Sequence, residues 1–196
     1  MKKLLIIIFV VMLIRQLSGV NSPVVLGPGV KVAEPPVQTD LKQAEPFQHD
    51  GYQITPLAEF KLQGKILSRE DYFLGRESEL SSIDLALGWG QMSDEAVLDK
   101  IDISQSGRWY RWQVKEFPIP RKDIETQSAN MHMIPANDLV EDMLDSAKQG
   151  QIIELTGYLI RAEAEDGWNW QSSLTRNDTG AHACEVVYVE SFQLIN

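Results

Sequence analysis

Thiols and imidazoles are scarce in this chain. One cysteine, Cys184, and three histidines occur among 196 residues. A single cysteine excludes an intramolecular disulfide, and no cysteine follows the N-terminal apolar run, which excludes a lipid-attached cysteine there. The histidines and the cysteine lack H-x-x-x-H or C-x-x-C spacing, so the sequence predicts no metal site. No phosphate loop or dinucleotide fingerprint is present either, and we expect no cofactor.

Basic residues are also in short supply. The chain has 18 Lys and Arg against 28 Asp and Glu, and three of the basic residues lie in the first 19 positions. Affinity for nucleic acid comes mainly from cations that contact phosphate, so this balance argues against a nucleic-acid partner. It also argues against docking on anionic lipid through a basic surface. A nucleic-acid site would require a local cluster formed by Arg108, Arg111, Arg161 and Arg176.

The first 19 residues have the features of a secretory signal. Lys2 and Lys3 precede an apolar run of 11 residues, Leu4–Ile14, and small residues follow at Ser18-Gly19. The run is shorter than the roughly 20 residues of a spanning helix. Because Arg15 lies close to a weak cleavage site, a retained membrane anchor through residues 4–14 stays open, as does a buried core segment. We expect a protein of the cell envelope, periplasmic or anchored in the cytoplasmic membrane facing the periplasm.

Residues 20–50 are rich in proline and show no lasting periodicity. Pro23, Pro28, Pro35, Pro36 and Pro46 fall in this stretch. Such a composition predicts a flexible, disordered linker. Residues 51–196 would then form a single β-rich globular domain.

Several segments of that domain have the composition or alternation of strands. Ala58–Ser68 alternates apolar with charged side chains, which indicates a half-buried strand, and Gly64 within it suggests a bulge or bend. Arg108–Lys115 also alternates, with Tyr110 and Trp112 on one face. Both faces of Gln151–Glu163 and of Ala183–Ile195 are apolar, which predicts that these two segments are central strands. The candidates are Ala58–Ser68, Arg108–Lys115, Asn130–Pro135, Gln151–Glu163 and Ala183–Ile195; Ser82–Trp89 is ambiguous between strand and helix.

Two helices are expected between these strands. Asp138–Lys148 has helical apolar spacing, Asn137 as N-cap and Gly150 as terminator. A shorter helix through Ile101 would begin at the N-cap Ser93. The fold class is therefore α+β, mainly β. We expect an OB-like partly open barrel with one principal helix and one short helix, after the N-terminal apolar helix and the linker. A general α+β sheet with helices on one face is the alternative.

Tryptophan in loops and on strand faces points to binding. Trp109 and Arg111 share the outer face of their predicted strand, where aromatic and guanidinium groups could hold a ligand. Trp168 and Trp170 follow an Asp-Gly turn and share a face. The competing interpretation assigns such aromatic residues to the core, which they dominate by area.

Catalysis has less support than binding. His182 lies two residues before Cys184, and side chains so spaced on a strand have Cβ atoms about 7 Å apart, too far for direct proton transfer. No G-x-S-x-G elbow arranges a Ser–His–Asp triad. A hydrolase or thiol enzyme that uses His132 or Cys184 remains the enzymatic alternative.

Three segments resemble a group of uncharacterised bacterial envelope proteins. They are Leu85–Ser93, Asn130–Ala136, and Asp166-Gly167-Trp168 together with Ser172–Arg176. The resemblance covers most of residues 52–195. It implies a bacterial envelope protein with one C-terminal domain, and it implies no activity, cofactor or catalytic residue.

Taken together, the sequence favours a non-enzymatic domain that binds a protein or small-molecule partner through aromatic and polar loops. The candidate binding residues are Trp89, Trp109, Arg111, His132, Trp168, Trp170 and Arg176.

Overall fold

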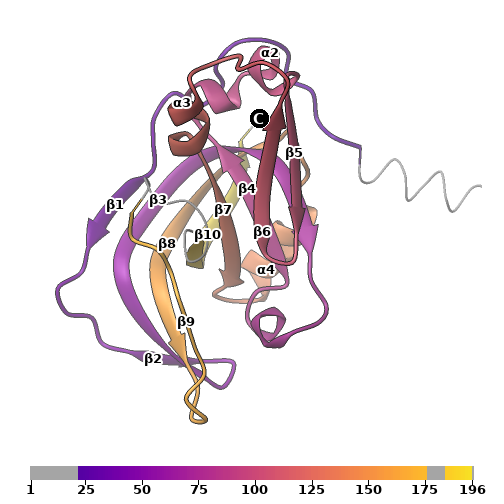
Figure 1. Cartoon of the computed structure of the whole chain (residues 1–196). Coiled ribbons are helices and arrows are strands. Elements are labelled where there is room, and N and C mark those ends of the chain that lie inside the picture. The colour runs from indigo at the N-terminus through magenta and orange to yellow at the C-terminus, as the bar shows by residue number, and fades with distance from the viewer. Residues whose placement is uncertain (1–21, 176–183, 196) are drawn as a thin grey trace, which may run out of the picture.

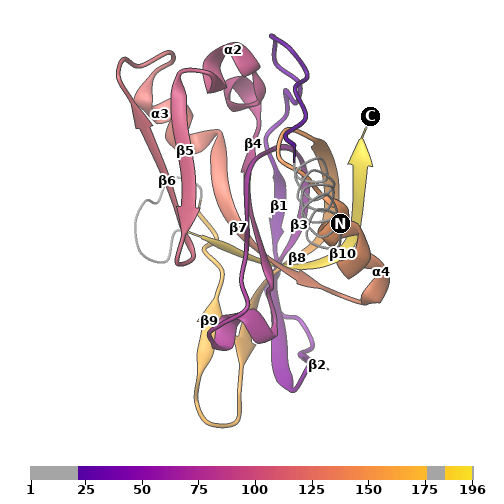
Figure 2. The ribbon, with the colours of Figure 1, turned by 90° about the vertical axis from the view of Figure 1, so that its right-hand side faces the viewer.

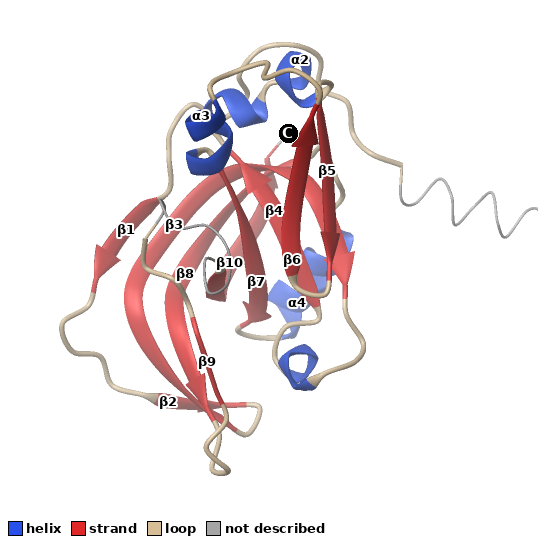
Figure 3. Ribbon diagram, viewed as in Figure 1, coloured by secondary structure: helices blue, strands red, loops and turns tan. Residues whose placement is uncertain are grey.

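The computed structural model describes residues 22–175 and 184–195. The predicted N-terminal signal or anchor, Arg176 and His182 lie outside these residues. The described chain is mainly β, as the sequence predicts, with short helices at the periphery (Figure 3). Its strands are β1 (Val37–Asp40), β2 (Phe47–His49), β3 (Tyr52–Asp71), β4 (Ile83–Gly88), β5 (Ile101–Ser106), β6 (Trp109–Val114), β7 (Ser128–Pro135), β8 (Ile152–Glu163), β9 (Asn169–Gln171) and β10 (Glu185–Ile195). Its helices are the 3-10 turns η1 (Arg76–Glu79) and η2 (Gly90–Ser93) and the α-helices α2 (Glu95–Leu98), α3 (Arg121–Thr126) and α4 (Asp138–Ser146).

The main sheet curls until its two sides meet, and we call it the curled sheet (Figure 1). Its pairings run from β3 to β4, β7, β10 and β8, and β8 pairs with β3 again. The β7–β10 pair is parallel and the other four pairs are antiparallel. As predicted, β8 and β10 are internal strands, with a partner on each side. The sheet is partly closed because β3 is long enough to bond β8 along Gln53–Lys65 and β4 along Lys65–Asp71.

The strand β3 confirms the predicted alternation and extends it at both ends. Phe60 and Leu62 are buried while Glu59 and Lys61 are exposed, so one face lines the interior. The bulge or bend predicted at Gly64 does not lie at that residue. The register of β3 shifts instead between Ile66 and Ser68, and between Pro56 and Ala58. The prediction also fails at Lys65, which the alternation places in solvent. Its side chain is buried and pairs with Glu95.

Large apolar side chains fill the interior of the curled sheet. Phe60, Leu85, Met131, Leu155 and Val187 belong to this main cluster and are at most 2% exposed. Two separate apolar clusters lie on the outside of the curled sheet. One surrounds Ile54 and Ile160, and the other lies under the β5–β6 hairpin. This layering explains why β8 and β10 are apolar on both faces.

The helix α4 begins as the sequence predicts. The Asn137 side chain accepts a hydrogen bond from the Val140 amide at 3.2 Å, which caps the first turn. The helix ends at Ser146, two residues before the predicted Lys148. Arg69 on β3 closes this end, because its guanidinium donates to the carbonyls of Leu144 and Ala147 at 2.6 and 2.9 Å.

The strands β5 and β6 form a hairpin that stands apart from the curled sheet, on the side opposite α4 (Figure 2). Gly107 and Arg108 both have positive φ, as a two-residue type I′ turn requires. Tyr110 and Trp112 point towards the curled sheet and join the cluster under the hairpin, whereas Trp109 is 43% exposed. The predicted division of this strand into an inner and an outer face is confirmed, and the ambiguous Ser82–Trp89 segment is a strand.

The predicted flexible linker is wrong for the described residues from 22 to 50. Two strands in this stretch, β1 and β2, pair with β3. The amides of Lys31 and Val32 donate to the Ser93 hydroxyl, and Val32 is buried in the main cluster. A proline-rich segment lacks periodicity but can still dock as an extended chain when a few donors and one apolar side chain find partners. The Ser93 hydroxyl binds these two amides. The N-cap of α2 is Asp94 rather than the predicted Ser93.

The helix α3 was not predicted, since its six residues follow two prolines and give little periodicity. None of the helices in the described parts of the chain is long and apolar enough to span a membrane.

Candidate functional site

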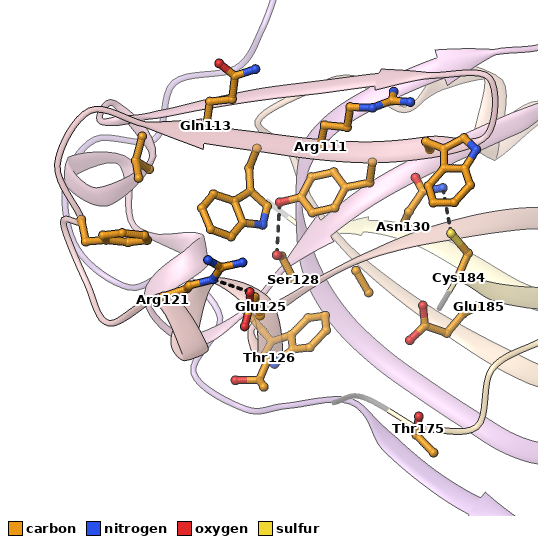
Figure 4. A pocket seen from close by; sticks show the side chains of 17 residues that line it. Arg111, Gln113, Arg121, Glu125, Thr126, Ser128, Asn130, Thr175, Cys184 and Glu185 are labelled. Atoms are coloured by element: carbon orange, nitrogen blue, oxygen red, sulfur yellow. Dashed lines mark hydrogen bonds and ion pairs between the residues drawn. The ribbon is translucent and has the colours of Figure 1, made fainter. Parts of the chain in front are cut away.

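A cleft of about 750 Å³ lies between the β5–β6 hairpin, α3 and the start of β7 (Figure 4). All six residues of β6 line it. Trp89, directly after β4, and Glu185 at the start of β10 contribute from the curled sheet. Thr175 and Cys184, the described residues on either side of positions 176–183, line it as well.

Aromatic rings from three segments make up the apolar part of this cleft. Trp109, Tyr110 and Trp112 come from β6, Phe117 from the turn before α3, and Trp89 from the curled sheet. Trp112 and Phe117 are in edge contact, with ring centroids 6.2 Å apart. Phe117 is half exposed and Trp109 is 43% exposed, so rings at the rim remain accessible to a ligand.

Polar side chains hold fixed positions among these rings. Arg121 on α3 bonds Glu125 one turn later, Nε to Oε1 at 2.8 Å, and its guanidinium lies 5.8 Å from the Trp112 ring centroid. The Tyr110 hydroxyl donates to Ser128 Oγ at 3.1 Å. Burial raises the pKa of Tyr110 to about 12, against the opposing effect of this bond. Tyr110 therefore stays a neutral hydrogen-bond donor at physiological pH.

The thiol of Cys184 lies at one side of the cleft. Asn130 Nδ2 is 3.8 Å from its sulfur, and the Arg108 carbonyl oxygen is 3.9 Å away. Neither an amide nor a carbonyl takes a proton from a thiol, and thiolate formation requires a base or a nearby positive charge. These contacts give no support to the thiol-enzyme alternative.

A second group of predicted residues lies under the hairpin tip, away from the cleft. His132 on β7 is 3% exposed, and its Nδ1 lies 2.8 Å from Asp84 Oδ1 on β4. Arg108 donates to the same oxygen at 2.6 Å. Trp170 packs on the His132 ring, with centroids 4.8 Å apart. These contacts attach the hairpin tip and β9 to the curled sheet.

Trp168 belongs to a clasp between the β3–β4 loop and the β8–β9 turn. The Arg76 guanidinium lies 4.9 Å from the Trp168 ring centroid and bonds Asp166 Oδ2 at 2.6 Å. The Tyr52 hydroxyl donates to Glu79 Oε2 at 2.5 Å. The hydrogen bond from Arg76 holds the pKa of Asp166 below its usual range. Arg76 also donates to the Tyr52 hydroxyl at 3.2 Å, so Arg76, Tyr52, Glu79 and Asp166 bond one another, which favours a structural role.

The structure thus separates the predicted binding residues into two places. Trp89, Trp109 and Arg111 line the cleft. His132, Trp168 and Trp170 take part in internal contacts, and Arg176 lies outside the described residues. Sequence reasoning missed α3 with Arg121 and Glu125, for which their helical spacing of four residues was the available signal.

Comparisons with protein-family models, with curated proteins and with solved structures find no match.

Two other kinds of site, a metal site and a basic site for nucleic acid, depend on clusters of particular side chains. No group of three or more His, Cys, Asp or Glu in residues 22–175 and 184–195 is placed to hold a metal ion. Arg108 is bonded to Asp84 and Arg161 to Glu163, Nε to Oε2 at 3.0 Å, so these arginines are neutralised where they lie.

Proposed function

We propose that this protein is a recognition module whose ligand binds in the cleft between β6, α3 and β7. The observation that carries the proposal is the cleft itself. Its volume of about 750 Å³ falls inside the roughly 300–1,000 Å³ typical of ligand pockets, and it combines aromatic walls with a few fixed polar groups.

The scaffold for this cleft is, in our proposal, an OB-like barrel. The five strands β3, β4, β7, β8 and β10 pair in the order 1-2-3-5-4-1, the third and fifth are parallel, and α4 connects the third to the fourth. This order and helix position support a small Greek-key barrel of the OB type. The hairpin β5–β6 and α3 are inserted between the second and third strands, whose outer face serves ligand binding in such barrels.

We further propose that the module acts in the bacterial envelope, exported or held by its N-terminal apolar run. The support for this location comes from Lys2, Lys3 and the apolar residues 4–14. The protein would then bind its ligand outside the cytosol. The acidic balance of the chain favours a protein or small-molecule ligand over nucleic acid.

The test is a binding survey with the full-length protein, isotope-labelled and followed by NMR. Peptide libraries, oligosaccharides and single-stranded DNA are the probes. We expect one probe class to shift the signals of β6 and α3, and its affinity to fall at least tenfold in Trp112→Ala. Leu139→Ser is the matched control, because Leu139 is 71% exposed on α4, on the opposite side of the curled sheet. If no probe class shifts β6 or α3 signals, the proposed function is wrong.

A further inference from the structure

The strand β6 presents its edge, rather than one face, to the cleft. Side chains of successive strand residues point to opposite faces. Tyr110, Trp112 and Val114 on the inner face line the cleft, and so do Trp109, Arg111 and Gln113 on the outer face. A cavity can touch both faces of a strand only where it runs along the strand's edge.

The hairpin register shows which backbone groups lie on that edge. Ser106 pairs with Trp109 across the two-residue turn, and the turn bond joins these two residues. Antiparallel pairs alternate between bonded and non-bonded, so Trp109, Arg111 and Gln113 direct their amides and carbonyls at β5. Those of Tyr110, Trp112 and Val114 point away from it.

Within the described part of the chain, β6 has β5 as its only strand partner. The backbone groups of Tyr110, Trp112 and Val114 therefore form a row along the cleft that no strand of residues 22–175 and 184–195 pairs with. Such an edge is a template for another strand. Successive donor–acceptor pairs in the row are two residues apart, about 6.8 Å, which is the repeat of an extended polypeptide.

We propose that the ligand is an extended polypeptide segment that adds as a strand to the free edge of β6. This inference rests on the proposed function of the cleft and specifies its ligand. A sugar or a nucleobase would use the ring faces of the cleft, but only a polypeptide backbone matches the row of amides and carbonyls. The six residues of β6 accommodate a partner strand of about four to six residues.

The side chains beside the edge indicate the composition of the partner strand. On the inner side, Tyr110 and Trp112 with Phe117 offer apolar surface. On the outer side, Arg111 is exposed and bonds Ser106 Oγ at 2.8 Å, and no carboxylate among the described residues forms a salt bridge with it. A strand with apolar residues at alternate positions and an acidic residue between them fits both sides.

The first measurement is amide hydrogen exchange of the full-length protein, resolved by residue with NMR. In the free protein we expect fast exchange at Tyr110, Trp112 and Val114 and slow exchange at Arg111 and Gln113. A decapeptide selected on the protein from a phage-displayed random library is then synthesised and added. It should slow exchange at the three edge amides at least tenfold and leave Arg111 and Gln113 unchanged, a two-residue pattern that side-chain binding would not produce.

A backbone N-methyl scan of the same decapeptide gives the complementary test. Methyl groups at alternate residues should weaken binding at least tenfold, whereas those at the intervening residues should change it less than threefold. Arg111→Glu should weaken a selected peptide that carries an acidic residue, and Leu139→Ser should bind like the parent protein.

The outcomes separate the two proposals. If a peptide binds in the cleft without the alternating exchange pattern, or if only oligosaccharide or single-stranded DNA shifts β6 and α3 signals, strand addition is wrong and the recognition function stands. If no probe of any class shifts those signals, both proposals fail.

Discussion

Arg108 at the tip of the β5–β6 hairpin binds Asp84 on the neighbouring strand β4, Nη1 to Oδ1 at 2.6 Å, although Asp84 has no solvent exposure. The same guanidinium donates to the Ser81 carbonyl at 2.7 Å and lies 3.9 Å from the Tyr72 ring centroid. The Arg108 backbone is held in the left-handed region at φ 68°, where the turn needs it. One residue therefore closes the turn and fixes the hairpin, and with it the edge of β6, to the curled sheet.

Removing this guanidinium should be costly. Arg108→Ala leaves the buried Asp84 carboxylate without its guanidinium partner, and we expect a loss of about 3 kcal/mol in the free energy of unfolding. The double variant Arg108→Leu/Asp84→Leu should lose less than Arg108→Ala, because no charge is then left buried. Urea unfolding of both variants checks this. A double variant less stable than the single one would contradict the interpretation.

Two glycines on the curled sheet should respond differently to the same substitution. A Cβ on Gly157 of β8 would lie 1.9 Å from the Tyr188 carbonyl oxygen, whereas a Cβ on Gly64 of β3 would lie 3.4 Å from Leu87 Cβ. We expect Gly157→Ala to cost at least about 3 kcal/mol, since backbone must move, and Gly64→Ala to change stability by less than about 1 kcal/mol. Thermal unfolding of the two variants provides the comparison, and equal losses would show that β8 and β10 separate easily.

The buried ion pair of Lys65 predicts an asymmetry between its two partners. Lys65 is 2% exposed and Glu95 is its carboxylate partner. Glu95→Ala leaves the ammonium buried and should cost about 3 kcal/mol, whereas Lys65→Met fills the space with an apolar chain and should cost less than about 1 kcal/mol. Denaturant titration of both variants measures the difference. Equal losses would mean that water reaches Lys65 when its partner is removed.

Acid should loosen the N-terminal segment from the domain. The Asp94 carboxylate accepts bonds from the amides of Ala96 and Gly29 at 2.9 and 2.8 Å, and these bonds lower its pKa. A carboxyl group with a lowered folded pKa contributes stability above its unfolded pKa of about 4, and this contribution is lost as the pH falls through the folded pKa. The amide exchange of Gly29 should therefore accelerate below about pH 4 beyond the change that pH alone produces.

The variant Asp94→Asn separates this effect from general acid unfolding. It should show faster Gly29 exchange at neutral pH and a weaker acid dependence. Asp142→Asn, an exposed position on α4, is the control and should retain the acid dependence of the parent. If all three proteins respond alike, the docking of residues 22–32 does not depend on Asp94.

Local signals in the sequence located most elements of the domain. The alternation of Phe60 and Leu62 with Glu59 and Lys61 gave β3, and Asn137 before an amphipathic stretch gave α4. Each of these signals comes from residues that lie close together in the chain, so it is visible without a structure. The segment α3 offered only the four-residue spacing of Arg121 and Glu125, and β1 has its partner about twenty positions later, in β3. The hairpin of β2 with the start of β3 did have a local signal, the Asp50-Gly51 turn, which was overlooked.

The candidate site was predicted only in part. Trp89, Trp109 and Arg111 were expected in a binding surface and they line the cleft, while His132 and Trp170 were expected there and contact each other inside the fold. The local sequence pattern indicates that a tryptophan lies in a loop or on one face of a strand. It does not show whether another segment will cover it.

The sequence by itself determined the mainly β class, the division of β6 into an inner and an outer face, and the start of α4. Strand alternation and helix capping act over two to four residues, so they are visible in the sequence. The tertiary structure alone decided that Lys65 is buried, that residues 22–50 pack on the domain, and that β6 borders a cleft. Lys65 and Glu95 lie 30 positions apart, and Val37 pairs with Lys61, 24 positions later. Such contacts depend on how the whole sheet closes, and no local pattern encodes that.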